Sequence, residues 1–458
     1  MGSVPILRRR YRPPIVDIDP SWLHELGEFL AIRSVSADPG CHDEVVRAGE
    51  WVRDALRGAG GEAELADWNG QPLALGELRA SSGSDAAPTV LCYGHFDVQP
   101  VDPVELWTSP PFEATIRDGW LYARGAADDK GQLYMLLRAT ADLAAAGELP
   151  VNVRFACDGE EETIGTSLVE WLESDERGAD AAIIFDSGFH RRGVPVFNVA
   201  TRGLCYLHVR VRTGERDLHS GMYGGAALNA AHALIETLAA VVPRDGRLPE
   251  ALRAGIAEPT EQEVADWAQL VGGSEMLAAQ GARAADSAAA ARFYHRTWAE
   301  PSVDVHGLDS GSAHLQKTIV PAAAEANVSV RLAPGQDVEE VAAAAERLLR
   351  EGAPAGAEVE VTRLATGAPG LIDPGSPAIR LGLDAFERVL GVRPLLVRGG
   401  GTLPIVPALA AKGIPTILTG FDLPDGNAHS PNERLALDLL PLGIAAARET
   451  LVALGDLR

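Results

Sequence analysis

Short apolar runs alternate with helix-period segments along the first part of the chain. The runs at 89–93, 151–157 and 181–185 are apolar almost throughout, which is typical of strands buried on both faces. Segments with apolar positions three and four residues apart predict helices at 44–57, 131–146 and 166–174. This alternation predicts an α/β fold in which helices cover both faces of a sheet.

The pattern changes near Thr201. Residues 204–212 alternate between apolar and polar positions, as a half-buried antiparallel strand does. The segments that follow predict the order β-α-β-β-α-β of a two-layer α+β domain with the split βαβ, ferredoxin-like layout: helices at 226–242 and 338–350, and strands at 316–320, 326–332 and 358–364. A polar, alanine-rich and helix-prone stretch at 249–296 is expected to be an insertion in this domain.

After this second pattern the chain returns to the first. A helix at 378–390, a strand at 416–419 and a long helix at 434–454 are expected to complete the α/β domain. The domain organisation is therefore predicted to be discontinuous. Residues 1–202 form the first part of the catalytic domain, 203–366 an inserted lid and dimerisation domain, and 367–458 the second part of the catalytic domain.

Composition narrows the class of protein. The chain has 458 residues, of which 46% are hydrophobic and 23% charged, as in ordinary globular proteins. A net charge of -24 argues against nucleic acid as a partner, because phosphate backbones are bound by clustered Lys and Arg. The basic run Arg8-Arg-Arg-Tyr-Arg12 is expected to be a solvated arm. Without a signal-peptide core or an apolar run of membrane length, we expect a cytoplasmic protein with no membrane partner.

Histidine and acidic residues stand where the predicted strands end. His95 and Asp97 follow one strand, Glu161 and Glu162 the next, and Asp186 a third. Ligands gather at the carboxyl ends of strands in such sheets. Two further candidates are Asp128, before a predicted helix, and His429, near the C-terminus. Imidazoles and carboxylates without cysteine are typical of a hydrolytic metal pair and unlike a structural zinc site.

Five short motifs are distributed over both predicted domains. They are Gly94-His-Phe-Asp-Val-Gln-Pro100, Arg124-Gly-Ala-Ala-Asp-Asp-Lys-Gly131, Glu161-Glu162, Asp217-Leu-His-Ser-Gly-Met-Tyr-Gly-Gly225 and Ala428-His-Ser-Pro-Asn-Glu433. Together they resemble one known family, that of cytosolic non-specific dipeptidase and carnosinase, within the aminoacylase, carboxypeptidase and desuccinylase superfamily. The resemblance runs from about Trp22 to the C-terminus.

The resemblance implies a dizinc hydrolase and assigns a role to each candidate. His95 and Asp186 would hold one Zn²⁺ and Glu162 and His429 the other, with Asp128 bridging the two. Mn²⁺ and Co²⁺ suit the same donors. Glu161 would be the general base, and Asp97 would orient the His95 ring. Asp129 stands where the family has a cis peptide.

The second domain is implied to bind the substrate. Arg331 would clamp a substrate carboxylate, with Thr318, Gly400, Gly401 and Thr402 beside it. His219 would polarise the scissile carbonyl in the partner subunit of a homodimer. On pattern alone, Arg331 would be a solvent-facing charge, residues 399–401 a flexible turn and His219 the cap of a glycine-rich turn. The chain departs from the family at Gly399, where Glu is usual, and at Thr402, where Ser is usual.

The sequence therefore predicts a metal-dependent hydrolase that cleaves dipeptides with zinc-activated water. An N-acyl-amino-acid deacylase of the same family is the alternative substrate class. A catalytically inactive binding or assembly module is a different class, and the intact set of ligands with a general base argues against it. A dimetal phosphatase or nuclease is disfavoured by the acidic composition and by Arg331, which suits a carboxylate.

Overall fold

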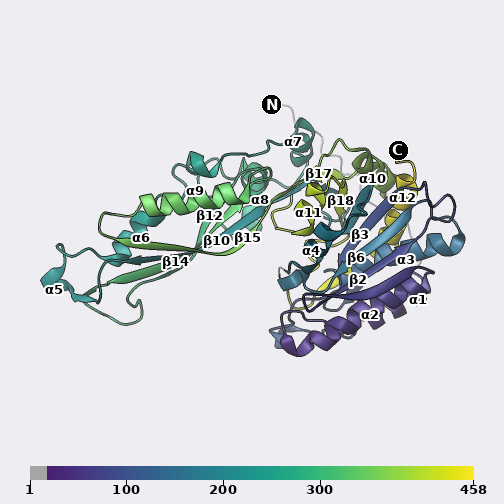
Figure 1. The fold of residues 1–458 in the computed structure, drawn as a ribbon, viewed down its shortest axis with the longest axis horizontal. Coiled ribbons are helices and arrows are strands. Elements are labelled where there is room, and N and C mark those ends of the chain that lie inside the picture. The colour runs from purple at the N-terminus through teal and green to yellow at the C-terminus, as the bar shows by residue number, and fades with distance from the viewer. Residues whose placement is uncertain (1–17, 164, 458) are drawn as a thin grey trace. The chain divides into compact units, whose positions relative to one another are not determined.

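The structure is a computed structural model that describes residues 18–163 and 165–457 (Figure 1), so the predicted arm Arg8–Arg12 lies outside the described residues. The chain divides into two compact units. The first unit contains Met1–Val199, Ile372–Leu396 and Ala408–Arg458, and the second contains Ala200–Leu371 and Val397–Pro407. Among the described residues, no helix combines the length and apolar character needed to cross a membrane.

The segment Val397–Pro407 groups with the second unit, whereas the sequence placed it in the catalytic domain. Hydrogen bonds explain the difference. The Gly399 N–H donates to the carbonyl of Ala200 over 2.6 Å, and the Arg398 Nε lies 2.7 Å from a carboxylate oxygen of Glu263. A loop between two elements of the first unit is therefore held by the second unit.

The first unit is built on an eight-stranded mixed sheet with the order β1-β2-β6-β3-β7-β18-β8-β17. Strands β6, β3, β7 and β18 run parallel, while β1 and β2 form an antiparallel hairpin at one edge. The strands are β1 (Glu62–Trp68), β2 (Gln71–Leu78), β3 (Thr89–His95), β6 (Asn152–Asp158), β7 (Ala181–Phe185), β8 (Val196–Asn198), β17 (Leu395–Val397) and β18 (Thr416–Thr419). The prediction of an α/β fold is confirmed.

Helices cover both faces of this sheet, as its doubly apolar central strands require. On one face, α2 contacts β1 and β2, α3 contacts β3, and α12 packs between α3 and α10. Helix α4 contacts the sheet at β1, β2 and β6. The helices are α1 (Pro20–Leu30), α2 (His42–Gly58), α3 (Lys130–Ala146), α4 (Ser167–Ser174), α10 (Pro377–Leu390) and α12 (Leu439–Leu454). A small separate sheet contains β4 (Thr115–Arg117), β5 (Trp120–Tyr122) and β19 (Arg434–Ala436).

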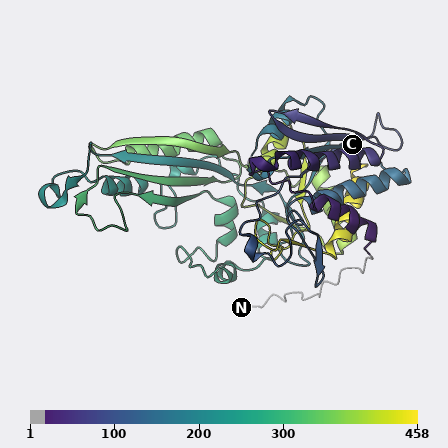
Figure 2. The same cartoon turned by 90° about the horizontal axis from the view of Figure 1, so that it is seen from below.

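The second unit is a four-stranded antiparallel sheet with helices α6 and α9 on one face, and both helices run along the sheet in Figures 1 and 2. Apolar residues of β10 and β14 alternate toward the helices and form the core. The strand order is β12-β14-β10-β15. The main elements are β10 (Gly203–Arg212), α6 (Ala230–Leu238), β12 (Ser302–Asp309), β14 (Ala323–Leu332), α9 (Val338–Glu351) and β15 (Glu358–Gly367).

Smaller elements surround this core. The predicted insertion at 249–296 forms two short α-helices, a 3-10 turn at Glu250–Leu252 and the start of a π-helical turn, His295–Ala299. The remaining α-helices and strands are β9 (Ala200–Thr201), β11 (Leu218–His219), α5 (Ser220–Tyr223), α7 (Glu261–Trp267), α8 (Gly273–Ala279), β13 (Ile319–Val320), β16 (Gly370–Leu371) and α11 (Ile405–Ala411).

Two predicted elements are wrong. The strand at 316–320 is reduced to β13, which pairs with β11 outside the main sheet, and β12 takes its place beside β14. The predicted helix at 434–454 begins only at Leu439, because Arg434–Ala436 pairs with β5 as a strand. In both cases a partner distant in sequence decides the outcome.

Candidate metal centre

The parallel strands of the first unit bring the predicted ligands to one edge of the sheet. His95 is the last residue of β3, and Asp186 directly follows β7. After β6, the chain forms a 3-10 turn at Glu161–Thr163 that carries the acidic pair. Since the carboxyl ends of parallel strands share an edge, these side chains converge.

Asp128 lies between the two histidines. Its Oδ1 is 3.0 Å from His95 Nε2, and its Oδ2 is 2.9 Å from His429 Nε2. Two groups could each hold a metal ion, and Asp128 belongs to both: His95, Asp128 and Asp186 form one, and Asp128, Glu162 and His429 form the other. The peptide bond between Asp128 and Asp129 is cis.

The adjacent acids Glu161 and Glu162 have different surroundings. The Glu162 Oε2 lies 3.1 Å from His429 Nε2 and accepts a hydrogen bond from Gln99 over 2.8 Å. Its Oε1 is buried with no hydrogen-bond partner among the described residues. The Glu161 carboxylate belongs to neither candidate metal group and makes no hydrogen bond with any described residue. One acid of the pair therefore belongs to a candidate metal group, and the other belongs to neither.

The charges of the cluster fit divalent cations. Burial raises the pKa of Asp186 to about 7, and the Asp128 and Glu162 carboxylates add to this rise against the opposing effect of His95. Burial likewise raises the pKa of Glu161 to about 8. Buried carboxylates that face one another are stabilised when cations lie between them. Imidazole nitrogens with carboxylate oxygens are the donors that Zn²⁺, Mn²⁺ and Co²⁺ accept.

Asp97 connects the first histidine to the acidic turn. The His95 Nδ1 lies 3.2 Å from the Asp97 carbonyl and 3.4 Å from its carboxylate. The same carboxylate accepts the backbone N–H groups of Glu161 and Glu162 over 3.3 and 3.1 Å. With Nδ1 facing these acceptors, Nε2 is the ring nitrogen that faces Asp128.

Glu433 ends the motif Ala428-His-Ser-Pro-Asn-Glu433, but the sequence predicted no role for it. Its buried Oε1 accepts the backbone N–H groups of Ala127 and Asp128 over 2.9 and 3.0 Å. Its Oε2 accepts from Gly125 N–H over 3.1 Å and from Arg124 Nη1 over 2.6 Å. Glu433 thus fixes the backbone that carries Asp128 to the segment that carries His429. No local pattern signals this role, because its partners are some 300 residues away in sequence.

The predicted substrate contacts all lie in the second unit, in two places. Arg331 Nη1 donates to Thr402 Oγ1 over 3.3 Å, and Thr402 Oγ1 donates to the Arg202 carbonyl over 2.7 Å. Gly400 and Gly401 precede Thr402, and a Cβ on either glycine would meet nothing within 4 Å. These residues therefore border open space.

His219 and Thr318 lie elsewhere in the second unit. His219 Nδ1 accepts the Gly221 N–H over 3.1 Å, and the Thr318 carbonyl accepts the Ser220 N–H over 3.0 Å. His219 is the last residue of β11, and Thr318 directly precedes β13, with which β11 forms a ribbon. This ribbon is tied to the start of β14 by the hydrogen bond that Ala322 N–H donates to Asp217 Oδ1. Arg331 stands eight residues beyond Ala323 along β14, or about 27 Å at about 3.4 Å per residue.

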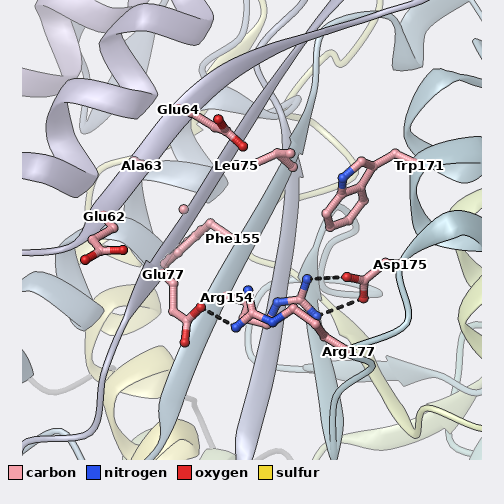
Figure 3. Close-up of a pocket in the computed structure, with 11 residues that line it drawn as sticks. Glu62, Ala63, Glu64, Leu75, Glu77, Arg154, Phe155, Trp171, Asp175 and Arg177 are labelled. Atoms are coloured by element: carbon pink, nitrogen blue, oxygen red, sulfur yellow. Dashed lines mark hydrogen bonds and ion pairs between the residues drawn. The ribbon is translucent and has the colours of Figure 1, made fainter.

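A separate cavity of about 440 Å³ lies against β1, β2 and β6 (Figure 3). Its cationic groups already have carboxylate partners. Arg154 donates to Asp175 over 2.7 and 2.9 Å, and Arg177 pairs with Glu77. None of the predicted site residues lines this cavity.

Comparisons with known proteins extend over most of the chain. Residues 91–453 match the model of peptidase family M20/M25/M40. The cysteinylglycine-S-conjugate dipeptidase of Corynebacterium striatum is 30% identical over 421 residues, which cover 89% of this chain and 90% of that protein. The Beta-Ala-His dipeptidase of Homo sapiens is 27% identical over 445 residues, with 90% and 86% covered. The structure of the M20 metallo-carboxypeptidase Sso-CP2 from Sulfolobus solfataricus matches with a TM-score of 0.83 at 28% identity, covering 96% of this chain and 100% of that one.

Proposed function

This chain belongs to peptidase family M20/M25/M40, and we propose that it is a metal-dependent hydrolase that cleaves the peptide bond of dipeptides. Relatives that are named dipeptidases support this substrate class. The observation that carries the proposal is Asp128, whose two carboxylate oxygens each face the imidazole of a different histidine. A shared carboxylate of this kind is what a pair of neighbouring cations needs.

In this proposal the chain holds two Zn²⁺ ions, for which Mn²⁺ or Co²⁺ could substitute. His95 and Asp186 would hold one ion and Glu162 and His429 the other, with Asp128 contributing to both groups. When bound, the ions would lower the pKa of a water molecule and polarise the carbonyl of the scissile bond.

The residues around the ions have separate tasks. Glu161, free of hydrogen bonds to described residues, takes the proton from the attacking water and passes it to the departing amine. Asp97 holds the His95 ring so that Nε2 faces the metal side. Glu433 keeps the backbone of Asp128 in place by accepting the N–H groups of Ala127 and Asp128.

Arg331 is proposed to bind the C-terminal carboxylate of the substrate, with Thr402 and the open loop at Gly400 and Gly401 beside it. An N-acyl amino acid carries the same carboxylate, so a deacylase remains the second candidate. A panel of dipeptides and of N-acetyl and N-succinyl amino acids, assayed for released amine with added Zn²⁺ or Mn²⁺, decides between them. Cleavage of dipeptides supports the proposal, cleavage of N-acyl substrates alone favours the deacylase, and cleavage of neither indicates an inactive binding module.

Amidation of the substrate carboxylate is expected to weaken hydrolysis strongly. Because the Arg331 guanidinium would lose its anionic partner, kcat/KM for Gly-Leu-amide should fall below that for Gly-Leu by about 2 to 5 kcal/mol, roughly 30-fold or more. Arg331→Met should remove most of this difference by lowering the rate on Gly-Leu. Equal rates of the unmodified enzyme on both substrates would show that no free carboxylate is bound.

We further propose that the second unit serves as a lid and dimerisation domain with the ferredoxin-like layout, and that the enzyme is a homodimer. The support is that the ribbon of His219 is tied to the start of β14, while Arg331 lies about 27 Å farther along this strand. One second unit cannot bring these two residues to a single dipeptide, whereas a two-fold dimer can supply His219 from the partner. The cytoplasmic location stays a prediction.

Two inactive variants are expected to restore activity when their subunits exchange. His219→Ala and Glu161→Ala should each be inactive alone. In a mixed dimer, one site has an intact Glu161 of its own and an intact His219 from the partner. Random exchange makes about half of the dimers mixed with one working site of two, so roughly a quarter of wild-type activity should return.

A second mixture is the matched control for this experiment. In a mixture of Glu161→Ala and Asp186→Ala, each subunit carries one defect in its own first unit, which the partner cannot replace. Every site in every dimer is therefore defective, and no activity should return. If mass measurement shows mixed dimers of His219→Ala and Glu161→Ala but activity stays absent, His219 acts within its own subunit or only caps α5.

A further inference from the structure

Arg202 differs from the other buried arginines of the described chain. The buried arginines among the described residues are Arg124, Arg154, Arg202 and Arg398, all at most 6% exposed. Arg124, Arg154 and Arg398 each have a carboxylate oxygen within 2.6 to 2.7 Å, on Glu433, Asp175 and Glu263. No described carboxylate forms an ion pair with Arg202. A buried guanidinium without an anion is energetically costly and uncommon, so we expect an anionic ligand to bind Arg202.

The contacts of Arg202 hold it in place without neutralising it. Its Nη2 donates to the Glu300 carbonyl over 3.1 Å and to Ser302 Oγ over 2.9 Å, while its Nε is buried with no partner among the described residues. Burial, together with the nearby Arg331 charge, lowers the pKa of Arg202 to about 10 against the opposing effect of Asp304. Asp304 is exposed on β12, where solvent screens its charge. Arg202 therefore remains a cation at neutral pH.

Arg202 also belongs to the proposed carboxylate site. Its backbone N–H donates to the Gly401 carbonyl over 3.1 Å, and its carbonyl accepts the hydroxyl of Thr402, which in turn accepts from Arg331. Arg331 has no ion pair with a described carboxylate either. Two guanidinium groups without anions thus stand at one loop, beside the open space at Gly400 and Gly401.

The two positive charges of Arg202 and Arg331 indicate the kind of ligand that fits this site. One carboxylate satisfies one guanidinium in a bidentate pair, so a ligand with a single carboxylate would leave the second cation unpaired. We propose that Arg202 binds a second carboxylate, that of an acidic C-terminal side chain, and that the enzyme prefers dipeptides that end in Asp or Glu. This inference rests on the proposed dipeptidase function.

Pairs of substrates that differ in charge but hardly in shape test this preference. The wild-type kcat/KM should be at least about 10-fold higher for Gly-Glu than for Gly-Gln, and likewise for Gly-Asp over Gly-Asn. Arg202→Met should bring these ratios close to one, mainly by slowing the acidic substrates. The matched control is Arg210→Met, which removes an exposed arginine of β10, the strand that follows Arg202, and should leave the ratios unchanged. Wild-type ratios near one would overturn the inference, whether or not Arg202→Met folds.

Product binding separates this inference from the proposed function. Free glutamate should raise the thermal midpoint (Tm) of the wild-type holoenzyme more than the same concentration of glutamine, and Arg202→Met should lose this difference. If glutamate stabilises but no dipeptide is cleaved, the dipeptidase function fails and the acidic site stands. If dipeptides are cleaved but glutamate and glutamine stabilise equally, the dipeptidase function stands and the acidic site fails.

Discussion

Glu161→Gln is expected to lower the turnover number by roughly 10² to 10⁴-fold while the metal content of the protein stays unchanged. Glutamine keeps the shape of the side chain but cannot take a proton. Because the Glu161 carboxylate belongs to neither candidate metal group, its loss should leave the ligands in place. Steady-state kinetics and elemental analysis of the same preparation give both quantities.

The neighbouring residue provides the control. The Glu162 carboxylate lies 3.1 Å from His429 and belongs to a candidate metal group, so Glu162→Gln should lower the affinity for one ion. Excess metal should then recover part of the activity of Glu162→Gln and none of the activity of Glu161→Gln. If Glu161→Gln loses metal and keeps its turnover, the roles of the two acids are reversed.

Removal of metal by a chelator is expected to abolish dipeptide hydrolysis and to lower the Tm. Without cations, the carboxylates of Asp186, Glu162 and Asp128 face one another with only two imidazoles between them. An ion present at about 1,000 times its Kd contributes about 4 kcal/mol of stability to the folded protein, which chelation removes. Activity and Tm should both return when Zn²⁺ or Mn²⁺ is added.

Asp128→Asn is the matched variant for the metal experiment. It removes the charge shared by the two candidate metal groups, so its Tm should respond much less to the chelator than that of the wild type. A wild-type Tm and turnover that both ignore the chelator would contradict a metal-dependent reaction.

Patterns local in sequence predicted the strands that carry the site. The apolar run at 89–93 became β3, and the run at 181–185 is the whole of β7. The alternation at 204–212 became β10. These segments are buried on one or both faces, so their own pattern of apolar residues indicates which faces are buried. The convergence of His95, Glu162 and Asp186 then followed from the shared direction of their strands.

Other elements depend on partners that the local sequence does not name. The edge strand β12 is mostly exposed, so its residues lack a clear apolar face. The hairpin of β1 and β2 was not predicted, although the dipeptide Asn69-Gly70 is a sequence signal for a tight hairpin turn. Both residues have positive φ in the turn that joins the two strands. The contacts of Glu433 and Arg202 join residues far apart in sequence, which no spacing reveals.

A titration of the metal-free protein with Zn²⁺, in which bound metal and dipeptide turnover are measured at every step, shows whether hydrolysis needs two ions. The shared position of Asp128 predicts that turnover reaches its maximum only as the second ion per subunit binds. Full turnover with one ion per subunit, or turnover in protein without bound metal, would contradict the account.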